Sequence, residues 1–434
     1  MLRSRAEGGD PAAELELALR YMQRDERESA LTWIEKSIAR RHGDSLYTMA
    51  VWLTQGMLVP QDHERASQLL QQGTGVGHAG CRSLLAVSYS LGLGVEPSWR
   101  EAVSLMIGGA IDKDPQALRQ LAVLLHLTGR RPQHAHRLMF QAIIYGDVPA
   151  RYLMAQRMLR GEVKGFGPAM AVLLMEDAAR LGFGPAQTEL PALARHRGNN
   201  PGGFGDEWAG RSWASQPEFE SCRKFLLDGL TFPTAVSEPV SDEPHAMVFR
   251  KCLPEELCDY LRMVAYPHMR PSSTVDTRTG QLIQTTYRTS SSMAFAPMLL
   301  DLVVHCVNLR YAALLDLPAE TGEILSVLRY QPGEEYKAHS DYFVMGPEGR
   351  DELERNGQRI YTLFSTLHPA ELGGTTSFPK AEIVVTLGKG DALAFRNVDE
   401  DGEPDPMSIH QGDRVDRGEK WLAVKWFRTK PYQL

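Results

Sequence analysis

The chain has 434 residues, of which 43% are hydrophobic and 23% are charged, and its formal net charge is −7. Since one domain takes about 150 residues, a chain of this length predicts more than one domain. The composition is that of a folded globular protein and excludes a disordered chain, a collagen and a coiled-coil rod. The negative charge argues against nucleic acid as the main partner, because the phosphate backbone attracts basic proteins.

Membrane insertion and secretion are not expected either. No stretch reaches the roughly 18 consecutive apolar residues of a membrane span, and residues 1–10 lack the apolar centre of a secretory signal. The 5 cysteines are an odd number and form no Cys-x-x-Cys pair, so neither a disulfide framework nor a cysteine zinc site is predicted. We therefore expect a cytoplasmic protein with neither a membrane nor a nucleic acid among its partners.

Small residues recur at a regular spacing in the first part of the chain. Glycines that would end one helix alternate with alanines at which a second helix would pack closely. The alanines, 33 or 36 residues apart, are Ala30, Ala66, Ala102, Ala135 and Ala171, and the glycines are Gly56, Gly92, Gly129 and Gly161. This period predicts an all-α solenoid of stacked helix pairs over residues 12–192.

The clearest unit, Leu-Leu-Ala-Val-Ser-Tyr-Ser-Leu-Gly-Leu-Gly-Val at 84–95 followed by a second helix with Ala102, resembles the Sel-one-like class of tetratricopeptide-related repeats. The resemblance implies a protein-interaction scaffold. An irregular helical domain without a binding function remains the alternative, because helical periodicity alone arises readily.

A change in composition separates this array from the rest. Residues 193–215 lose the helical period and gain glycine, which predicts a linker. The second predicted domain comprises residues 216–434, with a core at 246–434. In it a probable helix at 254–265 is followed by strands. Segments rich in β-forming residues occur at 324–330, 359–365, 382–387, 392–395 and 421–426. Their density predicts a jelly roll, or double-stranded β-helix, with flanking helices.

Two histidines and a carboxylate form the candidate metal site. His339 and Asp341 are two positions apart in an extended segment, so their side chains point to the same face. His410 lies beyond three further predicted strands. Two histidines and one carboxylate on one face are the ligand set of non-haem Fe(II) oxygenases, and they leave coordination positions open.

Lys420 strengthens this interpretation. It follows His410 by ten positions and leads into an apolar strand, where a buried ammonium group is costly unless it is paired. A dicarboxylic co-substrate would supply that partner, with one carboxylate on the iron and the other on the lysine. A surface lysine at the start of a strand is the alternative.

Several motifs in order resemble the catalytic domain of the prolyl 4-hydroxylase family of Fe(II)/2-oxoglutarate dioxygenases. The matching segments are the opening helix at 249–258, Arg-Thr-Ser-Ser at 288–291, the Tyr-x-x-Gly-x-x-Tyr-x-x-His-x-Asp pattern at 330–341, Gly-Gly-Thr-Thr-Ser-Phe-Pro at 373–379, Gly-Asp-Ala-Leu-Ala-Phe at 390–395, and Ser-Ile-His-Gln-Gly at 408–412 through Lys420-Trp421.

The resemblance implies Fe(II), 2-oxoglutarate and O2 as cofactors, with L-ascorbate as an optional further one. It implies iron ligation by His339, Asp341 and His410. Lys420 would bind the distal carboxylate of 2-oxoglutarate, and Tyr330 and Thr376 would donate hydrogen bonds to the co-substrate. A cross-strand aromatic and a turn hydroxyl are the structural alternatives for these last two.

The substrate side departs from the family pattern. The family's Lys-Trp-x-His continues here as Lys-Trp-Phe-Arg, so Arg428 replaces the histidine, and Ser326 stands where the family has glutamine. Arg359 matches a family arginine on the substrate side and is assigned a catalytic role; a surface strand residue is the alternative. These departures put proline specificity in question and leave the iron chemistry intact.

The resulting hypothesis is a two-domain dioxygenase that hydroxylates a peptidyl residue, with proline as the first candidate, and converts 2-oxoglutarate to succinate and CO2. The repeats would recruit a protein or peptide substrate. The alternatives are hydroxylation of a free amino acid or other small molecule and, in another class, an interaction scaffold that senses oxygen or 2-oxoglutarate.

Overall fold

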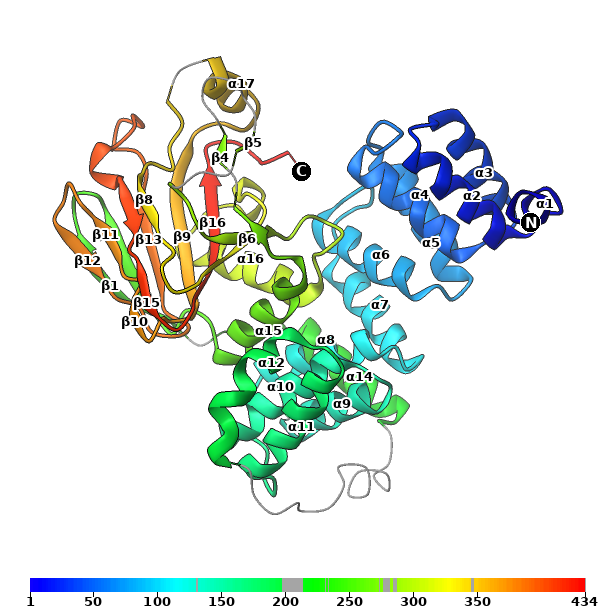
Figure 1. Ribbon diagram of the computed structural model, residues 1–434, viewed down its shortest axis with the longest axis horizontal. Helices are drawn as coiled ribbons and strands as arrows, with labels where there is room; N and C mark the ends of the chain where they lie inside the picture. The colour runs from blue at the N-terminus through cyan, green and yellow to red at the C-terminus, as the bar shows by residue number, and fades with distance from the viewer. Residues whose placement is uncertain are drawn as a thin grey trace. The chain divides into compact units, whose positions relative to one another are not determined.

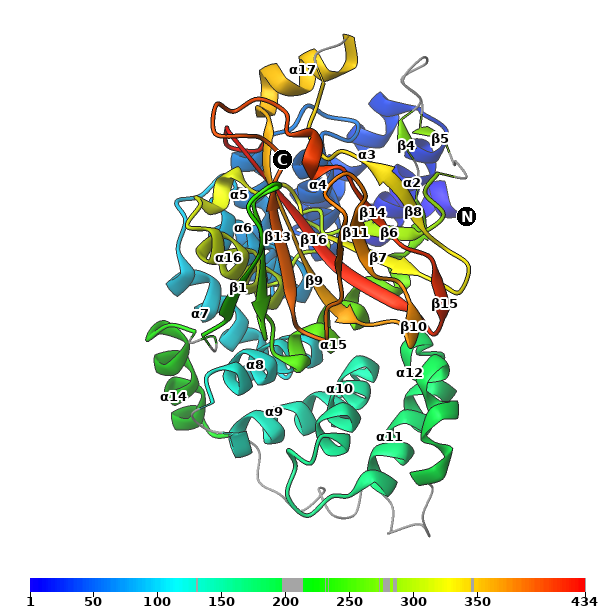
Figure 2. The same ribbon diagram turned by 90° about the vertical axis from the view of Figure 1, so that its left-hand side faces the viewer.

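The chain divides into two compact units (Figures 1 and 2). The first holds helices α1 to α9, helix α14 and the segment Pro297–His305, and the second holds helices α10 to α12, helix α15 and the β-sheets. The computed structural model describes residues 1–129, 132–196, 214–230, 232, 234–272, 274–275, 282–283, 287–344 and 347–433. Most of the predicted linker, residues 197–213, lies outside the described residues.

Consecutive helices pack in pairs in the first unit: α2 with α3, α4 with α5, α6 with α7, and α8 with α9. The helices are α1 (Leu2–Glu7), α2 (Pro11–Gln23), α3 (Arg27–Ala39), α4 (Gly43–Gln55), α5 (His63–Gly75), α6 (Ala79–Leu91), α7 (Trp99–Ile111), α8 (Pro115–Leu127), α9 (Pro132–Ile144) and α14 (Gln216–Leu227). The predicted solenoid of helix pairs is confirmed.

The ends of these helices follow from local sequence. Asp114 precedes a proline and accepts hydrogen bonds from the first free N–H groups of α8, as an N-cap aspartate does. Helices α4 and α6 end at Gly56 and Gly92, whose φ angles of 68° and 74° place them in the left-handed region. Glycine suits these positions because it has no Cβ to clash there.

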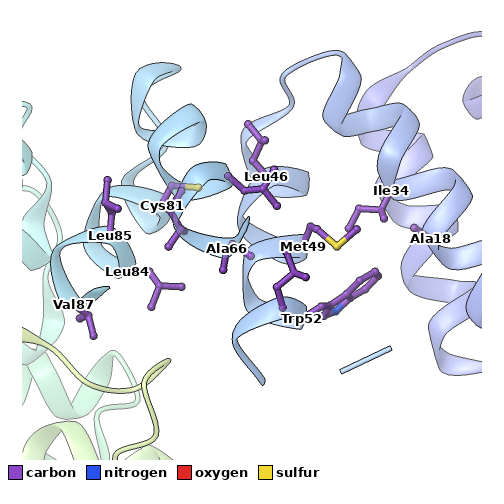
Figure 3. Close-up of a cluster of buried hydrophobic side chains, with 14 of the residues drawn as sticks. Ala18, Ile34, Leu46, Met49, Trp52, Ala66, Cys81, Leu84, Leu85 and Val87 are labelled. Atoms are coloured by element: carbon purple, nitrogen blue, oxygen red, sulfur yellow. The ribbon is translucent and has the colours of Figure 1, made fainter. Parts of the chain in front are cut away.

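The alanines of the period are buried where helices meet. Ala30, Ala66, Ala102, Ala135 and Ala171 are each at most 2% exposed. Larger apolar side chains, among them Ile34, Met49 and Trp52, form a continuous core through successive helices (Figure 3). Met298 and Leu300, from the segment Pro297–His305, pack against the same core, so this unit contains a piece of chain far from the repeats in sequence.

Two main antiparallel sheets form the second unit. The larger has the order β1-β2-β13-β9-β16-β7-β6-β3 and the smaller the order β12-β11-β14-β8. The strands are β1 (Val236–Ser241), β2 (Ala246–Arg250), β3 (Arg270–Pro271), β4 (Thr274–Val275), β5 (Leu282–Ile283), β6 (Ser291–Ala294), β7 (Ser326–Tyr330), β8 (Tyr336–His339), β9 (Arg359–His368), β10 (Leu372–Gly373), β11 (Thr376–Phe378), β12 (Ile383–Val385), β13 (Ala392–Arg396), β14 (His410–Gly412), β15 (Val415–Arg417) and β16 (Lys420–Arg428).

An apolar core lies between these sheets. Phe364, Phe395 and Leu422 of the larger sheet pack in one cluster with Phe378 and Val385 of the smaller sheet. Each segment predicted as a strand overlaps one, and the predicted helix at 254–265 corresponds to α15. The flanking helices are α10 (Val148–Leu159), α11 (Pro168–Arg180), α12 (Gly184–Glu189), α15 (Glu255–Ala265), α16 (Leu302–Leu315) and α17 (Pro347–Asn356). The predicted jelly roll with flanking helices is confirmed.

Buried ion pairs join α10 to α15 inside the second unit. The guanidinium of Arg157, fully buried, donates from Nε to both carboxylate oxygens of Glu256 at 3.0 and 3.1 Å. Arg160 pairs with Asp259 at 2.7 Å, and Lys389 reaches the same carboxylate at 2.6 Å. The second unit thus combines α10 to α12, which belong to the predicted range 12–192, with strands of the predicted range 216–434. The bounds 12–192, 193–215 and 216–434 stay predictions.

Within the described ranges, every helix is too short or too polar to cross a lipid bilayer. All five cysteines are buried, and burial raises the pKa of Cys81 to about 12 and that of Cys252 to about 11. Protonated, inaccessible thiols of this kind pack as small apolar groups.

Candidate metal and co-substrate site

The three predicted metal ligands meet at one point of the smaller sheet. His339 ends β8 and His410 begins β14, and these strands are neighbours in the smaller sheet (Figure 2). Their register pairs the two histidines directly. Asp341 follows β8, and its carboxylate oxygens lie 3.8 Å from Nε2 of His339 and 3.7 Å from Nε2 of His410. The sheet topology thus brings together residues that are 69 positions apart.

Backbone carbonyls orient both imidazole rings. Nδ1 of His339 is 2.8 Å from the Lys337 carbonyl, and Nδ1 of His410 is 3.1 Å from the Ser408 carbonyl. Because a carbonyl oxygen only accepts, each Nδ1 carries a proton, and in the neutral form of each ring Nε2 is the nitrogen with the free lone pair. One ligand atom of each histidine and a carboxylate oxygen of Asp341 lie within 4.8 Å of one another, so the three side chains can bind one metal ion.

The protonation states of His339 and Asp341 at neutral pH are those that bind a metal cation. Burial, followed by the effect of nearby His410, lowers the pKa of His339 to about 3, so this imidazole is uncharged. Burial alone would raise the pKa of Asp341, but the neighbouring histidines and Arg359 outweigh it and hold the pKa below its ordinary value. Metal ligation requires neutral imidazoles and an ionised carboxylate.

A hydrogen-bonded pair supports the Asp341 carboxylate from behind. The hydroxyl of Thr362 donates to Oδ2 of Asp341 at 2.7 Å, and the amide of Asn397 donates to Thr362 Oγ1 at 2.9 Å. Both supporting residues are at most 1% exposed. Sequence reasoning missed them; the available signal was a threonine inside the apolar strand β9, which alone does not indicate a metal site.

Lys420 lies beside a small cavity in the second unit. Its side chain is 5% exposed, and Nζ is 3.3 Å from the Thr375 carbonyl and 3.5 Å from the Thr376 hydroxyl. Burial lowers the pKa of this lysine to about 8, with Asp413 opposing the shift. The cavity is lined by apolar side chains such as Phe364 and by Thr376 and Lys420. A buried ammonium group at a cavity wall is suited to an anionic ligand.

Tyr330 stands next to the same lysine. The register of β16 with β7 pairs Lys420 with Tyr330, and Nζ lies 5.7 Å from the centre of the tyrosine ring. Tyr330 is 3% exposed, and burial raises the pKa of its hydroxyl, which therefore keeps its proton. The structure thus brings Lys420, Tyr330 and Thr376 together, and their roles toward a co-substrate stay predictions.

Arg359 approaches the metal site from β9. Its guanidinium donates to both oxygens of Glu323, at 2.5 and 2.8 Å, and lies 3.4 Å from the Asp341 carbonyl. The guanidinium packs 4.3 Å from the centre of the Trp426 ring, and the side chain is half-buried. Its predicted catalytic role stays a prediction. Glu323 was not among the predicted site residues.

The donor set fits a divalent iron ion. Two imidazole nitrogens and a carboxylate oxygen within 4.8 Å of one another form a three-ligand face, which leaves other coordination positions to small molecules. His339, Asp341 and His410 would hold such an ion.

Comparisons with known proteins agree with this geometry. Residues 325–428 match the model of the 2OG-Fe(II) oxygenase superfamily. Prolyl 4-hydroxylase 1 of Arabidopsis thaliana is 35% identical over 270 residues, an alignment that covers 59% of this chain and 88% of the relative.

Two solved structures are among those similar to this chain. The viral collagen prolyl hydroxylase of Paramecium Bursaria Chlorella virus-1 in complex with 2OG is 24% identical, with a TM-score of 0.34, and the match covers 43% of this chain and 97% of that one. A Sel1 repeat protein from Oxalobacter formigenes is 21% identical, with a TM-score of 0.37, and the match covers 41% of this chain and 74% of that one.

Proposed function

The chain belongs to the prolyl 4-hydroxylase family of 2-oxoglutarate-dependent Fe(II) dioxygenases, and we propose that it hydroxylates a peptidyl proline while 2-oxoglutarate is converted to succinate and CO2. The observation that carries the proposal is the meeting of His339, Asp341 and His410 at one point. When bound, Fe(II) couples the reduction of O2 to the oxidative decarboxylation of 2-oxoglutarate and supplies the oxidant for a substrate C–H bond.

Different residues of the protein bind the metal, orient its ligands and bind the co-substrate. His339 and His410 would present Nε2 to the metal, and Thr362 holds one oxygen of Asp341 so that the carboxylate keeps its orientation. Lys420 pairs with the distal carboxylate of 2-oxoglutarate in the adjacent cavity. Phe364, Val385 and Leu387 in the lining of that cavity lower the local dielectric constant and so would strengthen the ion pair.

The substrate side supports a second candidate, hydroxylation of a free amino acid or another small molecule. Arg428 stands where the family pattern has histidine, and Ser326 stands where it has glutamine. A change of recognition residues beside an intact metal site alters the substrate and leaves the reaction type in place.

The helix pairs are proposed to recruit the protein or peptide substrate, which a curved solenoid surface suits. An interaction scaffold that senses oxygen or 2-oxoglutarate is the proposal of another class. A cytoplasmic location and stimulation by L-ascorbate are also proposals. Recruitment predicts that the full chain has a lower KM for long prolyl peptides than for short ones with the same target sequence.

The deciding experiment measures succinate formed from 2-oxoglutarate and Fe(II), with and without a mixture of proline-rich peptides, and identifies hydroxyproline in the product by mass spectrometry. Turnover stimulated by peptide, with hydroxyproline formed, supports the proposal. Turnover that peptides leave unchanged moves the substrate to small molecules. A protein that binds no iron and forms no succinate contradicts both enzymatic proposals.

A further inference from the structure

Two arginines near the metal ligand Asp341 share one carboxylate. Glu323 accepts from Nε of Arg359 at 2.5 Å and from Nε of Arg428 at 2.6 Å, both through Oε1. The carboxylate is 7% exposed and Arg428 is 2% exposed, so this is a buried charge network. Removing one charged side chain from such a network leaves the remaining buried charges without an opposite charge beside them.

The strand register explains why the carboxylate is needed. Arg428 of β16 pairs directly with Arg359 of β9, and like charges at directly opposed positions repel each other. Glu323 precedes β7 and is held by its backbone N–H, which donates to the Trp426 carbonyl at 2.8 Å. The carboxylate is therefore fixed by the sheet edge and cancels the repulsion between the two arginines.

Aromatic rings hold the two guanidinium groups in place. The Phe343 ring centre lies 4.9 Å from the guanidinium carbon of Arg359 and 4.8 Å from that of Arg428. The Trp426 ring lies 4.3 Å from Arg359. Each contact falls within the range of a cation–π interaction. Arg359 therefore has one defined orientation, in which it lies 3.4 Å from the carbonyl of the metal ligand Asp341.

Arg428 also anchors the stretch of chain between Asp341 and Arg359. Its Nη1 donates to the Gly357 carbonyl at 3.0 Å, and its Nη2 pairs with Glu352 of α17 at 2.7 Å. A guanidinium can bond three acceptors at once because its five N–H groups lie in one plane. A lysine keeps the charge without this geometry, and a histidine offers only two nitrogens.

We propose that Arg428 is a positioning residue that, through the shared Glu323 carboxylate, holds Arg359 beside Asp341 and thereby sets the binding of the peptide substrate. This inference rests on the proposed function and extends it to a residue at which the chain departs from its family pattern. Arg428 acts through Arg359 and through the segment that carries Glu352, without contact to the metal ligands.

The test uses the full-length protein and the variants Arg428→Met and Arg428→Lys. We expect Arg428→Met to raise the KM for a prolyl peptide about tenfold, the equivalent of one lost charged hydrogen bond. The ratio of hydroxyproline to succinate should fall as well, because a misplaced substrate uncouples the two products. Arg428→Lys should give an intermediate KM. A general loss of stability would change kcat through the amount of active enzyme and would leave the peptide KM unchanged.

Two further variants make the result decisive. Arg417→Met removes an exposed arginine whose partner is Glu371, and it should leave both KM and the product ratio unchanged. Glu352→Gln weakens only one contact of Arg428 and should raise the peptide KM about threefold, which tests the inference even if Arg428→Met fails to fold.

The outcomes separate the two proposals. A wild-type protein without peptide-stimulated turnover overturns the proposed function and this inference together. A wild-type protein that hydroxylates peptide, with Arg428→Met and Glu352→Gln both unchanged in peptide KM and product ratio, overturns this inference alone.

Discussion

The two regions of the molecule differ in how many charged side chains they bury. Between the helix pairs the core is apolar, with residues such as Ile34 and Met49 packed against buried alanines. In the sheet unit, charged groups such as Lys420, Glu323 and Asp341 are all less than one tenth exposed. The helix pairs enclose a few charges, such as Glu14 and the ion pair of Arg119 with Asp147, and are stabilised mainly by apolar burial, whereas the second unit encloses more charges that must be compensated.

This difference predicts that the two units respond differently to substitutions. Apolar packing between neighbouring repeats is roughly additive, so one substitution there has a local effect. Buried charges depend on distant partners, and removing one partner leaves the other uncompensated. Substitutions in the sheet unit should therefore affect activity or stability much more strongly than substitutions between the repeats.

The largest effect is expected at the metal ligands. His339→Ala removes one of three donors, and succinate formation from 2-oxoglutarate should fall about a thousandfold or more, together with Fe(II) binding. His42 belongs to another His-x-Asp sequence, at the start of a repeat helix, so His42→Ala is the matched control and should retain full turnover. Turnover retained in His339→Ala would contradict the metal assignment.

Glu256→Ala tests the buried charges that join α10 to α15. Because it leaves the guanidinium of Arg157 without its carboxylate, the free energy of unfolding should fall by about 3–5 kcal/mol, measured by urea denaturation. Glu371→Ala breaks an exposed ion pair and should change it by less than about 1 kcal/mol. Equal effects of the two substitutions would mean that the contact between α10 and α15 contributes little.

Lys420→Met should raise the KM for 2-oxoglutarate about a hundredfold, because a buried carboxylate would lose its ammonium partner. Burial lowers the pKa of Lys420 to about 8, so in the wild-type protein the ammonium is lost as pH rises past that value. The KM should therefore increase above about pH 8, and the variant should lack this dependence. Lys380→Met, at an exposed position, is the control; a similar KM in both variants would place Lys420 outside the co-substrate site.

The smallest effect is expected between the repeats. Gly92 has a φ of 74°, and a Cβ there would lie 2.8 Å from Cγ of Pro97. Gly92→Ala should lower the free energy of unfolding by about 1–2 kcal/mol without changing succinate formation. Gly108 has open space around it, so Gly108→Ala should be neutral or slightly stabilising. A loss of turnover in Gly92→Ala would show that the repeats act on the chemistry.

The helix pairs could be predicted well because their signals are local. Glycines at helix ends and alanines at helix contacts recur with a period of 33 or 36 residues, and each reflects packing between neighbours in sequence. The triad and Lys420 were also proposed from the sequence, because the His-x-Asp pair, the later histidine and the lysine ten positions after it resemble the motifs of a known family. The structure brings the triad together, and the roles of these residues stay predictions. The predicted boundaries place the residues of α14 in the second domain. In the structure this helix packs on α7 and α8 of the first unit, a contact between segments that are distant in sequence.

The sequence by itself determined the helical period, the strands and the residue types that can bind iron and a dicarboxylate, because these depend on local spacing and chemistry. Only the tertiary structure decided that Thr362 and Asn397 support Asp341, and that Glu323 joins Arg359 to Arg428. These partners come from strands that are distant in sequence. Their pairing depends on strand order and register, which the long-range packing of the two sheets sets.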